Sequence, residues 1–159
     1  MAPRILIVED DPDMAELLRL ALSGAGYSIR TATTGKEALR KARRSPPDLV
    51  VLDVLLPGMN GFSVCERLRR EAATAAVPVL MTTVLPGEFP RLVGTEAGAD
   101  VYLSKPFRME ELLACVGDLL HRAGKSAEPG AVTPEPAADP HAHFLSASPA
   151  ADLRVNTVS

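Results

Sequence analysis

The chain of 159 residues has two cysteines, no tryptophan and no long block of like charge. Cys65 and Cys115 form no CxxC pair and show no metal-ligand spacing, which indicates thiols of a core or a helix surface in a reducing compartment. Acidic and basic residues are interspersed, and the net charge is −3. The composition therefore predicts neither a nucleic-acid surface nor a polybasic membrane patch.

Long apolar segments are also absent. The chain enters an apolar run at residues 5–8, without the basic region, long apolar segment or cleavage signature of a targeting sequence. This predicts a cytoplasmic protein that does not associate with membranes. Because the sequence has no internal repeat and an ordinary domain length, one core is expected.

A short apolar run at residues 49–52 ends in a carboxylate, Asp53, and a Pro57-Gly58 turn follows. Such a Val-rich run bounded by turn residues is typical of a central strand in a parallel sheet, buried on both faces. Asp53 would then lie at the carboxyl edge of the sheet, where ligands bind in open α/β folds. Taken alone, Asp53 could equally be a turn or helix-cap aspartate.

Apolar runs of this kind alternate with helical periods along the chain. Strands are expected at residues 5–8, 27–32, 49–52, 77–82 and 101–103. Helices are expected after Asp11-Pro12, after a capping box of Thr34 and Glu37, and at residues 62–72, 90–97 and 109–120. Because parallel crossovers are right-handed, this order predicts an α/β fold, a doubly wound five-stranded parallel sheet with helices on both faces.

The composition changes near residue 123. From there to Ser159, Ala, Pro, Ser, His and Gly dominate without a period of 2 or 3.6, so little apolar surface can offset the entropy of ordering. Residues 123–159 are therefore expected to form a disordered Ala/Pro-rich tail. His141 and His143 lie there without further metal ligands spaced around them. A short partner peptide near Phe144 stays an alternative.

Polar signals follow four of the expected strands. Glu9 and Asp10 follow the first strand and Asp53 ends the third, while Thr82-Thr83 and Lys105 come after the fourth and fifth. Packing does not require this coincidence. An acidic cluster repels itself unless a cation screens it, and oxygen ligands with open water positions suit Mg²⁺. The arrangement predicts an aspartate that takes up a phosphoryl group.

These motifs together resemble the receiver domain of two-component response regulators. The resemblance rests on Ile-Leu-Ile-Val-Glu9-Asp10-Asp11-Pro12, Asp53 with Pro57-Gly58-Met59-Asn60-Gly61, Thr83, and Tyr102 with Lys105-Pro106-Phe107. It covers about residues 3–122, so residues 1–122 are expected to form the receiver domain. The family has a flavodoxin-like fold, which implies the strand order 2-1-3-4-5.

The resemblance implies a phosphoacceptor site with Mg²⁺. In the family pattern Asp53 accepts the phosphoryl group and Lys105 pairs with it. Asp10 would bind Mg²⁺ directly, Glu9 would bind it through water, and the backbone carbonyl of Leu55 would complete the protein ligands. The phosphoryl donor would be a sensor histidine kinase or a histidine phosphotransfer protein.

The resemblance also implies a switch. Thr83 would close on the phosphoryl group and Tyr102 would change rotamer in response. The Lys105-Pro106 peptide bond would be cis. The output would be a changed surface around the fourth helix, the fifth strand and the last helix, which binds a target protein.

Three residues depart from the family pattern. Val84 stands where a small residue is usual, which predicts a crowded phosphoryl pocket. Val101 and Cys115 replace an aspartate and an arginine that serve the charged dimer face of many DNA-binding regulators. A mainly monomeric protein is therefore expected.

No helix-turn-helix or catalytic pattern follows residue 122. We expect a stand-alone receiver that acts on a protein partner, has no direct contact with nucleic acid, and is not an enzyme beyond promoting its own phosphorylation and dephosphorylation. An aspartate-nucleophile phosphohydrolase is disfavoured because Leu55 occupies the position of its second aspartate. A degenerate receiver, used as an unphosphorylated interaction module, stays the alternative, although no acidic, aspartate or lysine position is lost.

Overall fold

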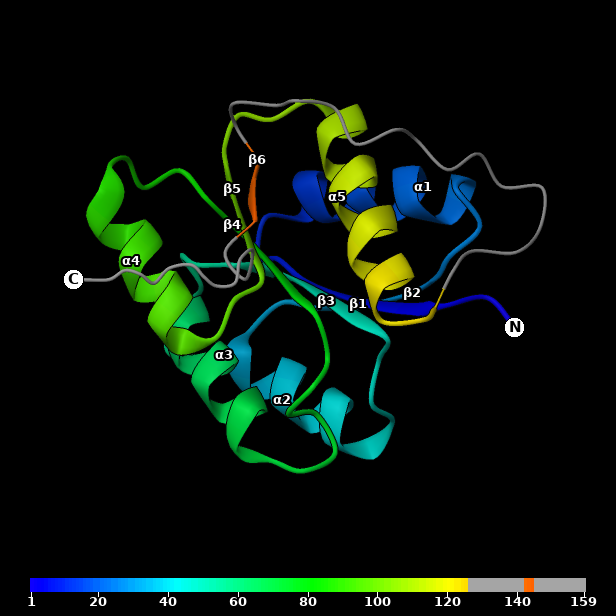
Figure 1. Ribbon diagram of the computed structural model, residues 1–159, viewed down its shortest axis with the longest axis horizontal. Coiled ribbons are helices and arrows are strands. Elements are labelled where there is room, and N and C mark those ends of the chain that lie inside the picture. Colours follow the sequence, from blue (N-terminus) through cyan, green and yellow to red (C-terminus); the bar gives the residue numbers. More distant parts are fainter. Residues whose placement is uncertain (126–141, 145–159) are drawn as a thin grey trace.

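The computed structural model describes residues 1–125 and 142–144 and contains a six-stranded sheet of order β2-β1-β3-β4-β5-β6 (Figure 1). The strands are β1 (Arg4–Val8), β2 (Ser28–Ala32), β3 (Leu49–Asp53), β4 (Val79–Thr83), β5 (Val101–Ser104) and β6 (Ala142–Phe144). The helices are α1 (Pro12–Gly24), α2 (Gly35–Arg44), α3 (Gly61–Arg70), α4 (Glu88–Ala97) and α5 (Met109–Arg122).

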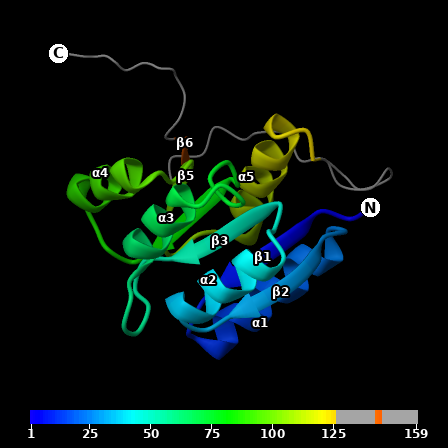
Figure 2. The same cartoon turned by 90° about the horizontal axis from the view of Figure 1, so that it is seen from below.

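The first five strands are parallel, which confirms the predicted doubly wound fold and its order 2-1-3-4-5. Helices α1 and α5 cover one face of the sheet, and α2, α3 and α4 cover the other (Figures 1 and 2). All five residues of β3 are buried, as expected of a central strand with helices on both sides.

Side chains at the helix starts explain where α1 and α2 begin. Asp11 caps α1 by accepting a hydrogen bond from the backbone N–H of Asp13, with Pro12 at the first helical position. Thr34 caps α2 by accepting from the backbone N–H of Glu37, as predicted. The Glu37 carboxylate, however, accepts from the backbone of Thr33 rather than Thr34, so the box is closed one residue earlier.

Helix α4 begins at Glu88, two residues before the predicted start at Pro90. Pro90 still lies in the first turn, where its missing N–H removes no helical hydrogen bond. Gly87, with φ of +93°, precedes the helix and provides no side-chain cap. The prediction was late because it assigned proline to the first position, whereas any position of the first turn is allowed.

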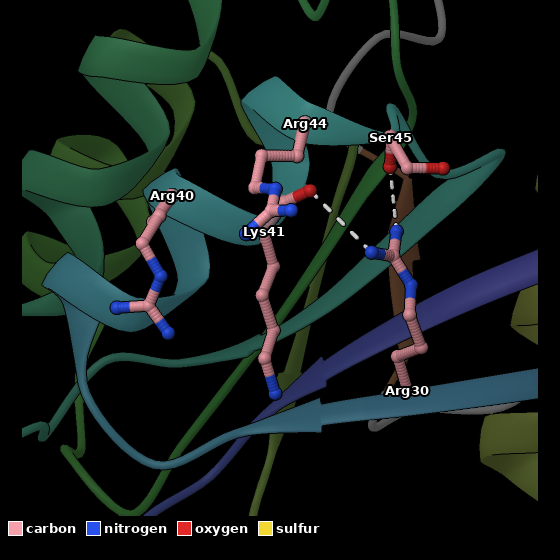
Figure 3. Close-up of a pocket in the computed structure, with 5 residues that line it drawn as sticks. All are labelled: Arg30, Arg40, Lys41, Arg44 and Ser45. Carbon is pink, nitrogen blue, oxygen red and sulfur yellow. Dashed lines mark hydrogen bonds between the residues drawn. The ribbon is translucent and has the colours of Figure 1, made fainter.

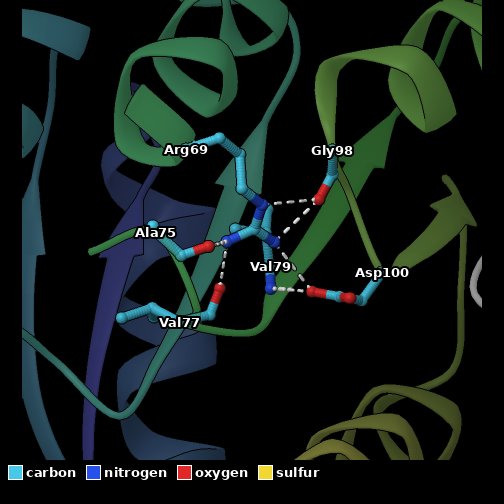
Figure 4. Close-up of polar contacts among 6 residues, drawn as sticks. All are labelled: Arg69, Ala75, Val77, Val79, Gly98 and Asp100. Atoms are coloured by element: carbon cyan, nitrogen blue, oxygen red, sulfur yellow. Dashed lines mark hydrogen bonds and ion pairs between the residues drawn. The ribbon is translucent and has the colours of Figure 1, made fainter. Parts of the chain in front are cut away.

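Arg69, near the end of α3, contacts the segments just before β4 and just after α4 (Figure 4). Its guanidinium donates to the carbonyl oxygens of Gly98, Ala75 and Val77 at 2.6–3.1 Å. It also pairs with the Asp100 carboxylate at 2.9 Å, and that carboxylate accepts from the backbone N–H of Val79. The end of α3, the start of β4 and the end of α4 thus share one cation.

The sixth strand is a correction to the predicted five. Ala142–Phe144 runs antiparallel to β5, with His143 opposite Tyr102. Periodicity could not find it, because three residues show no pattern and pairing with a free sheet edge uses backbone groups of any sequence. The remainder of the predicted tail beyond residue 125 lies outside the described residues.

The sequence predicts no membrane segment. Among the described residues, no helix is both long enough and apolar enough to span a bilayer.

Candidate functional site

The carboxyl ends of β1, β3 and β5 bring three charged side chains together. The ammonium Nζ of Lys105 lies 3.0 Å from Oε1 of Glu9 and 3.5 Å from Oδ2 of Asp53. Glu9 is 3% exposed and Asp53 is 6% exposed, so this ion triad is formed inside the protein. Sequence reasoning had placed these residues at one edge, and the structure puts them in contact.

Glu9, Asp10 and Asp53 form an acidic cluster. Each offers a carboxylate oxygen, and these oxygens lie within 4.8 Å of one another. Asp10 is exposed, whereas the other two are buried, so the cluster opens to solvent on the Asp10 side. Hard oxygen donors with access for water fit Mg²⁺, and Lys105 alone leaves the three carboxylates with excess negative charge.

Electrostatics within the triad shift the pKa of two groups. Burial raises the pKa of Glu9, and the Asp53 charge adds to this, although the hydrogen bond from Lys105 opposes both. Burial alone would lower the pKa of Lys105, but its contacts with Glu9 and Asp53 outweigh burial and raise it. Lys105 is therefore held as a cation.

The loop after β3 is shaped by a glycine. A Cβ on Gly61 would lie 2.3 Å from the Asp53 carbonyl oxygen, so only glycine allows the start of α3 to approach the acceptor strand this closely. The backbone N–H of Leu55 donates to Oδ1 of Asp53 at 3.3 Å, and the Leu55 side chain is 46% exposed. Leu55 therefore lies beside the carboxylate.

Thr83 ends β4 and is fully buried. Its hydroxyl oxygen accepts a hydrogen bond from the backbone N–H of Leu85 at 3.1 Å, and its carbonyl accepts from the N–H of Lys105 at 2.7 Å. The Lys105-Pro106 peptide bond is cis, as the resemblance implied. Thr83 and Lys105 are thus joined through the backbone at the same sheet edge.

Tyr102 points inward in this structure, with 1% of its surface exposed. Its hydroxyl is buried and has no hydrogen-bond partner among the described residues. Arg91 of α4 lies over the ring, and a Cβ on Gly94 would come within 3.1 Å of the ring edge. Sequence reasoning missed Arg91 and Gly94, although their helical spacing toward one face of α4 was a usable signal.

Comparison with known proteins identifies the arrangement. The sequence model of the family described as response regulator receiver domain matches residues 5–117 of this chain. The chain belongs to the response regulator receiver family. It is 46% identical over 123 residues to the DNA-binding dual master transcriptional regulator RpaA of Synechocystis, covering 77% of this chain and 51% of RpaA.

Two further relatives agree. The DNA-binding response regulator MtrA of Mycolicibacterium smegmatis is 44% identical over 122 residues, covering 77% of this chain and 52% of MtrA. The structure of the chemotaxis response regulator CheY4 of Vibrio cholerae superposes with a TM-score of 0.72 and 32% identity, covering 76% of this chain and 100% of CheY4.

The receiver spans about half the length of the curated relatives it matches. Those relatives are named as DNA-binding, so the comparisons do not support the expected stand-alone role or the expected absence of nucleic-acid contact. What they establish is a receiver domain of a two-component system, the class in which phosphorylation and Mg²⁺ binding are general.

The three departures from the family pattern lie in different surroundings in this receiver. Val101 and Cys115 are buried at 0% and 2% exposure, so neither side chain contributes to an outer face, and the inference of a monomer from these two residues was wrong. Val84 is 59% exposed and points its bulk to solvent rather than into a packed interior.

Proposed function

We propose that Asp53 of this receiver accepts a phosphoryl group from a phosphohistidine of a sensor kinase or a phosphotransfer protein. The observation that carries the proposal is the Lys105 ammonium, held between Glu9 and Asp53 at 3.0 and 3.5 Å. A cation fixed beside a carboxylate at a solvent-accessible edge is positioned to receive a doubly charged group there.

A magnesium ion fits the acidic cluster. Glu9, Asp10 and Asp53 would hold it, together with the backbone carbonyl of Leu55. When bound, Mg²⁺ supplies positive charge to phosphoryl oxygens. Burial first, and then the charge of Asp53, raise the pKa of Glu9, and a bound cation would offset the repulsion between these two carboxylates.

The chemical step is an in-line displacement at phosphorus. An oxygen of Asp53 forms the new bond to phosphorus, while the bond between phosphorus and the donor imidazole nitrogen breaks and its electron pair leaves with that nitrogen. Lys105 stays protonated and turns from the carboxylate oxygens to a phosphoryl oxygen. Because the attacking atom is a carboxylate oxygen, the step needs no general base.

The response passes from Asp53 to Thr83 and Tyr102. The phosphoryl group offers new acceptor oxygens, and the Thr83 hydroxyl can donate to one of them because at present it accepts from Leu85. Movement of Thr83 changes the space beside Tyr102, whose hydroxyl in its inward position has no hydrogen-bond partner within residues 1–125 and 142–144. The surface of α4, β5 and α5 then changes for a target protein.

We infer that this receiver is mainly monomeric and acts by binding rather than by catalysis on other molecules. Support comes from β6, which pairs with the outer edge of β5 and so removes that edge from pairing with a second copy. Sedimentation of the beryllofluoride-bound chain tests this inference. A stable dimer at micromolar concentration would contradict it.

The proposed phosphoacceptor is tested by mass. The chain is incubated with Mg²⁺ and acetyl phosphate, and its intact mass is measured. We expect one added phosphoryl group in the wild type and in Asp13→Ala, an exposed carboxylate outside the acidic cluster, and none in Asp53→Ala. Full labelling of Asp53→Ala would refute the assignment, and absence of labelling in the wild type would favour an unphosphorylated interaction module.

A further inference from the structure

A second charged site lies at the end of α2. A hollow of about 400 Å³ opens there, and its walls consist of residues from β2, α2 and the turn after α2 (Figure 3). These are Arg30, Arg40, Lys41, Arg44 and Ser45. Helix α2 runs from the carboxyl end of β2 back to the amino end of β3, so the hollow lies at the sheet edge opposite Asp53.

Two of the four cations have structural partners. Arg30 donates to the carbonyl oxygen of Ser45 at 2.6 Å and to that of Lys41 at 3.4 Å (Figure 3). Lys41 donates to the Thr31 carbonyl and pairs with Glu37 at 2.9 Å. The Arg30 contacts satisfy carbonyls at the end of α2, whereas Lys41 bonds to β2 and to a carboxylate of its own helix. Both cations offset the negative end of the helix dipole.

Arg40 and Arg44 are not used in this way. Both are exposed, and within the described ranges 1–125 and 142–144 neither makes a hydrogen bond or an ion pair. They are four residues apart on α2, so their Cβ atoms lie ~6 Å apart on one side of the helix. Two unengaged guanidinium groups therefore border the same hollow.

Positive charge is crowded around the hollow. Arg4 donates to the Ser45 hydroxyl at 2.6 Å, which brings a fifth cation to its border. Burial and the charge of Arg4 lower the pKa of Arg30. The lining residues include no carboxylate. An anion placed in the hollow would relieve this repulsion.

We propose that this hollow binds a small phosphate-bearing anion, with Arg40 and Arg44 as its direct ligands. One guanidinium group can donate two parallel hydrogen bonds to two oxygens of a phosphate. A multiply charged anion can bind both arginines at once, whereas a monocarboxylate would satisfy only one of them. The volume suits a small ligand. None of the described residues that line the hollow is aromatic, so the phosphate and not a nucleobase is recognised.

The test uses pyrophosphate as the probe. Binding to the full chain is measured by calorimetry at constant ionic strength in Mg²⁺-free buffer, a condition in which the acidic cluster around Asp53 repels anions. The variant Arg40→Gln/Arg44→Gln is compared with Lys36→Gln/Arg67→Gln. The latter removes the same charge from exposed positions of α2 and α3 that do not line the hollow.

We expect wild type and Lys36→Gln/Arg67→Gln to bind alike, and Arg40→Gln/Arg44→Gln to bind about ten-fold more weakly or worse. Amide shifts in the wild type should centre on residues 40–45. Equal weakening in both variants, or absence of binding to the wild type, overturns the proposal. A short DNA duplex is the second arm, and binding of the duplex without pyrophosphate binding would assign the surface to nucleic acid instead.

Discussion

The guanidinium carbon of Arg91 lies 5.1 Å from the ring centroid of Tyr102, which places a cation over the face of the switch residue. Nε and Nη1 of Arg91 are buried without hydrogen-bond partners among the described residues, and Glu88 approaches Nε only to 3.9 Å. The ring is therefore the main partner of this side chain. Such a contact is worth roughly 0.5–2 kcal/mol, depending on desolvation.

We predict that Arg91→Leu loosens the inward position of Tyr102 in the unphosphorylated receiver, because packing is retained while the cation is lost. The chain has two tyrosines and no tryptophan, so Tyr102 can be observed alone in a Tyr27→Phe background. Quenching of its fluorescence by acrylamide should increase several-fold at most. Arg40→Leu, a change at an exposed arginine of α2, is the control. Unchanged quenching in Arg91→Leu would show that other contacts hold Tyr102.

Sequence patterns predicted the strands and most helix starts because these depend on short-range periodicity and capping. The pocket residues could be placed together because parallel strands end at one edge, which made Glu9, Asp53 and Lys105 neighbours before any distance was known. Arg69, by contrast, contacts Gly98 and Asp100 across about thirty positions of sequence, and no local pattern records such a pairing.

The contact of Arg69 with Gly98 leads to a stability prediction. Arg69→Ala leaves three carbonyl groups without this donor and the Asp100 carboxylate with only the backbone N–H of Val79, and should lower the free energy of unfolding by about 2 kcal/mol. Arg69→Lys should recover little of the lost stability, since the compact ammonium of lysine lacks the planar set of N–H donors that reaches all these acceptors at once. Urea unfolding measures both, with the exposed Arg70→Ala as control. A loss equal to that of Arg70→Ala would contradict the role of Arg69.

Asp48 gives a pH-dependent prediction. Burial alone would raise its pKa, but hydrogen bonds from Lys125 and from the backbone N–H of Arg4, at 2.8 and 2.7 Å, outweigh burial and hold the pKa below its usual 3.8. A lowered carboxyl pKa stabilises the fold above the unfolded pKa, and this contribution is lost as pH falls through the folded pKa.

Asp48→Asn should therefore lower stability by no more than about 1 kcal/mol at pH 7, because the pair with Lys125 lies near the surface. The difference from wild type should shrink below pH 3.8. Thermal unfolding across pH measures the difference, and the exposed Glu96→Gln should show none at either end. A difference that grows toward acid would have the wrong sign for this account.

The last prediction concerns the lifetime of the aspartyl phosphate. Hydrolysis needs a water in line with phosphorus, and in receivers the residues two beyond the phosphoacceptor and two beyond the switch threonine flank that approach. Here these are Leu55 and Leu85. Neither can orient a water by hydrogen bonding, so a long-lived phosphoryl group is expected. The Leu55 side chain is 46% exposed, whereas Leu85 packs partly buried against the core between the sheet and α2, α3 and α4.

Because the Leu55 side chain is the more exposed of the two, Leu55→Asn should speed phosphoryl loss more than Leu85→Glu does. The rate of loss in the double variant should rise by ~10²-fold at most. Decay of the phosphorylated mass after removal of the donor measures the rate. Leu20→Asn, an exposed leucine of α1, controls for loss of surface apolarity. Equal decay in all variants would mean that the approach of water is set by the backbone around Asp53 and by Lys105, rather than by these two leucines.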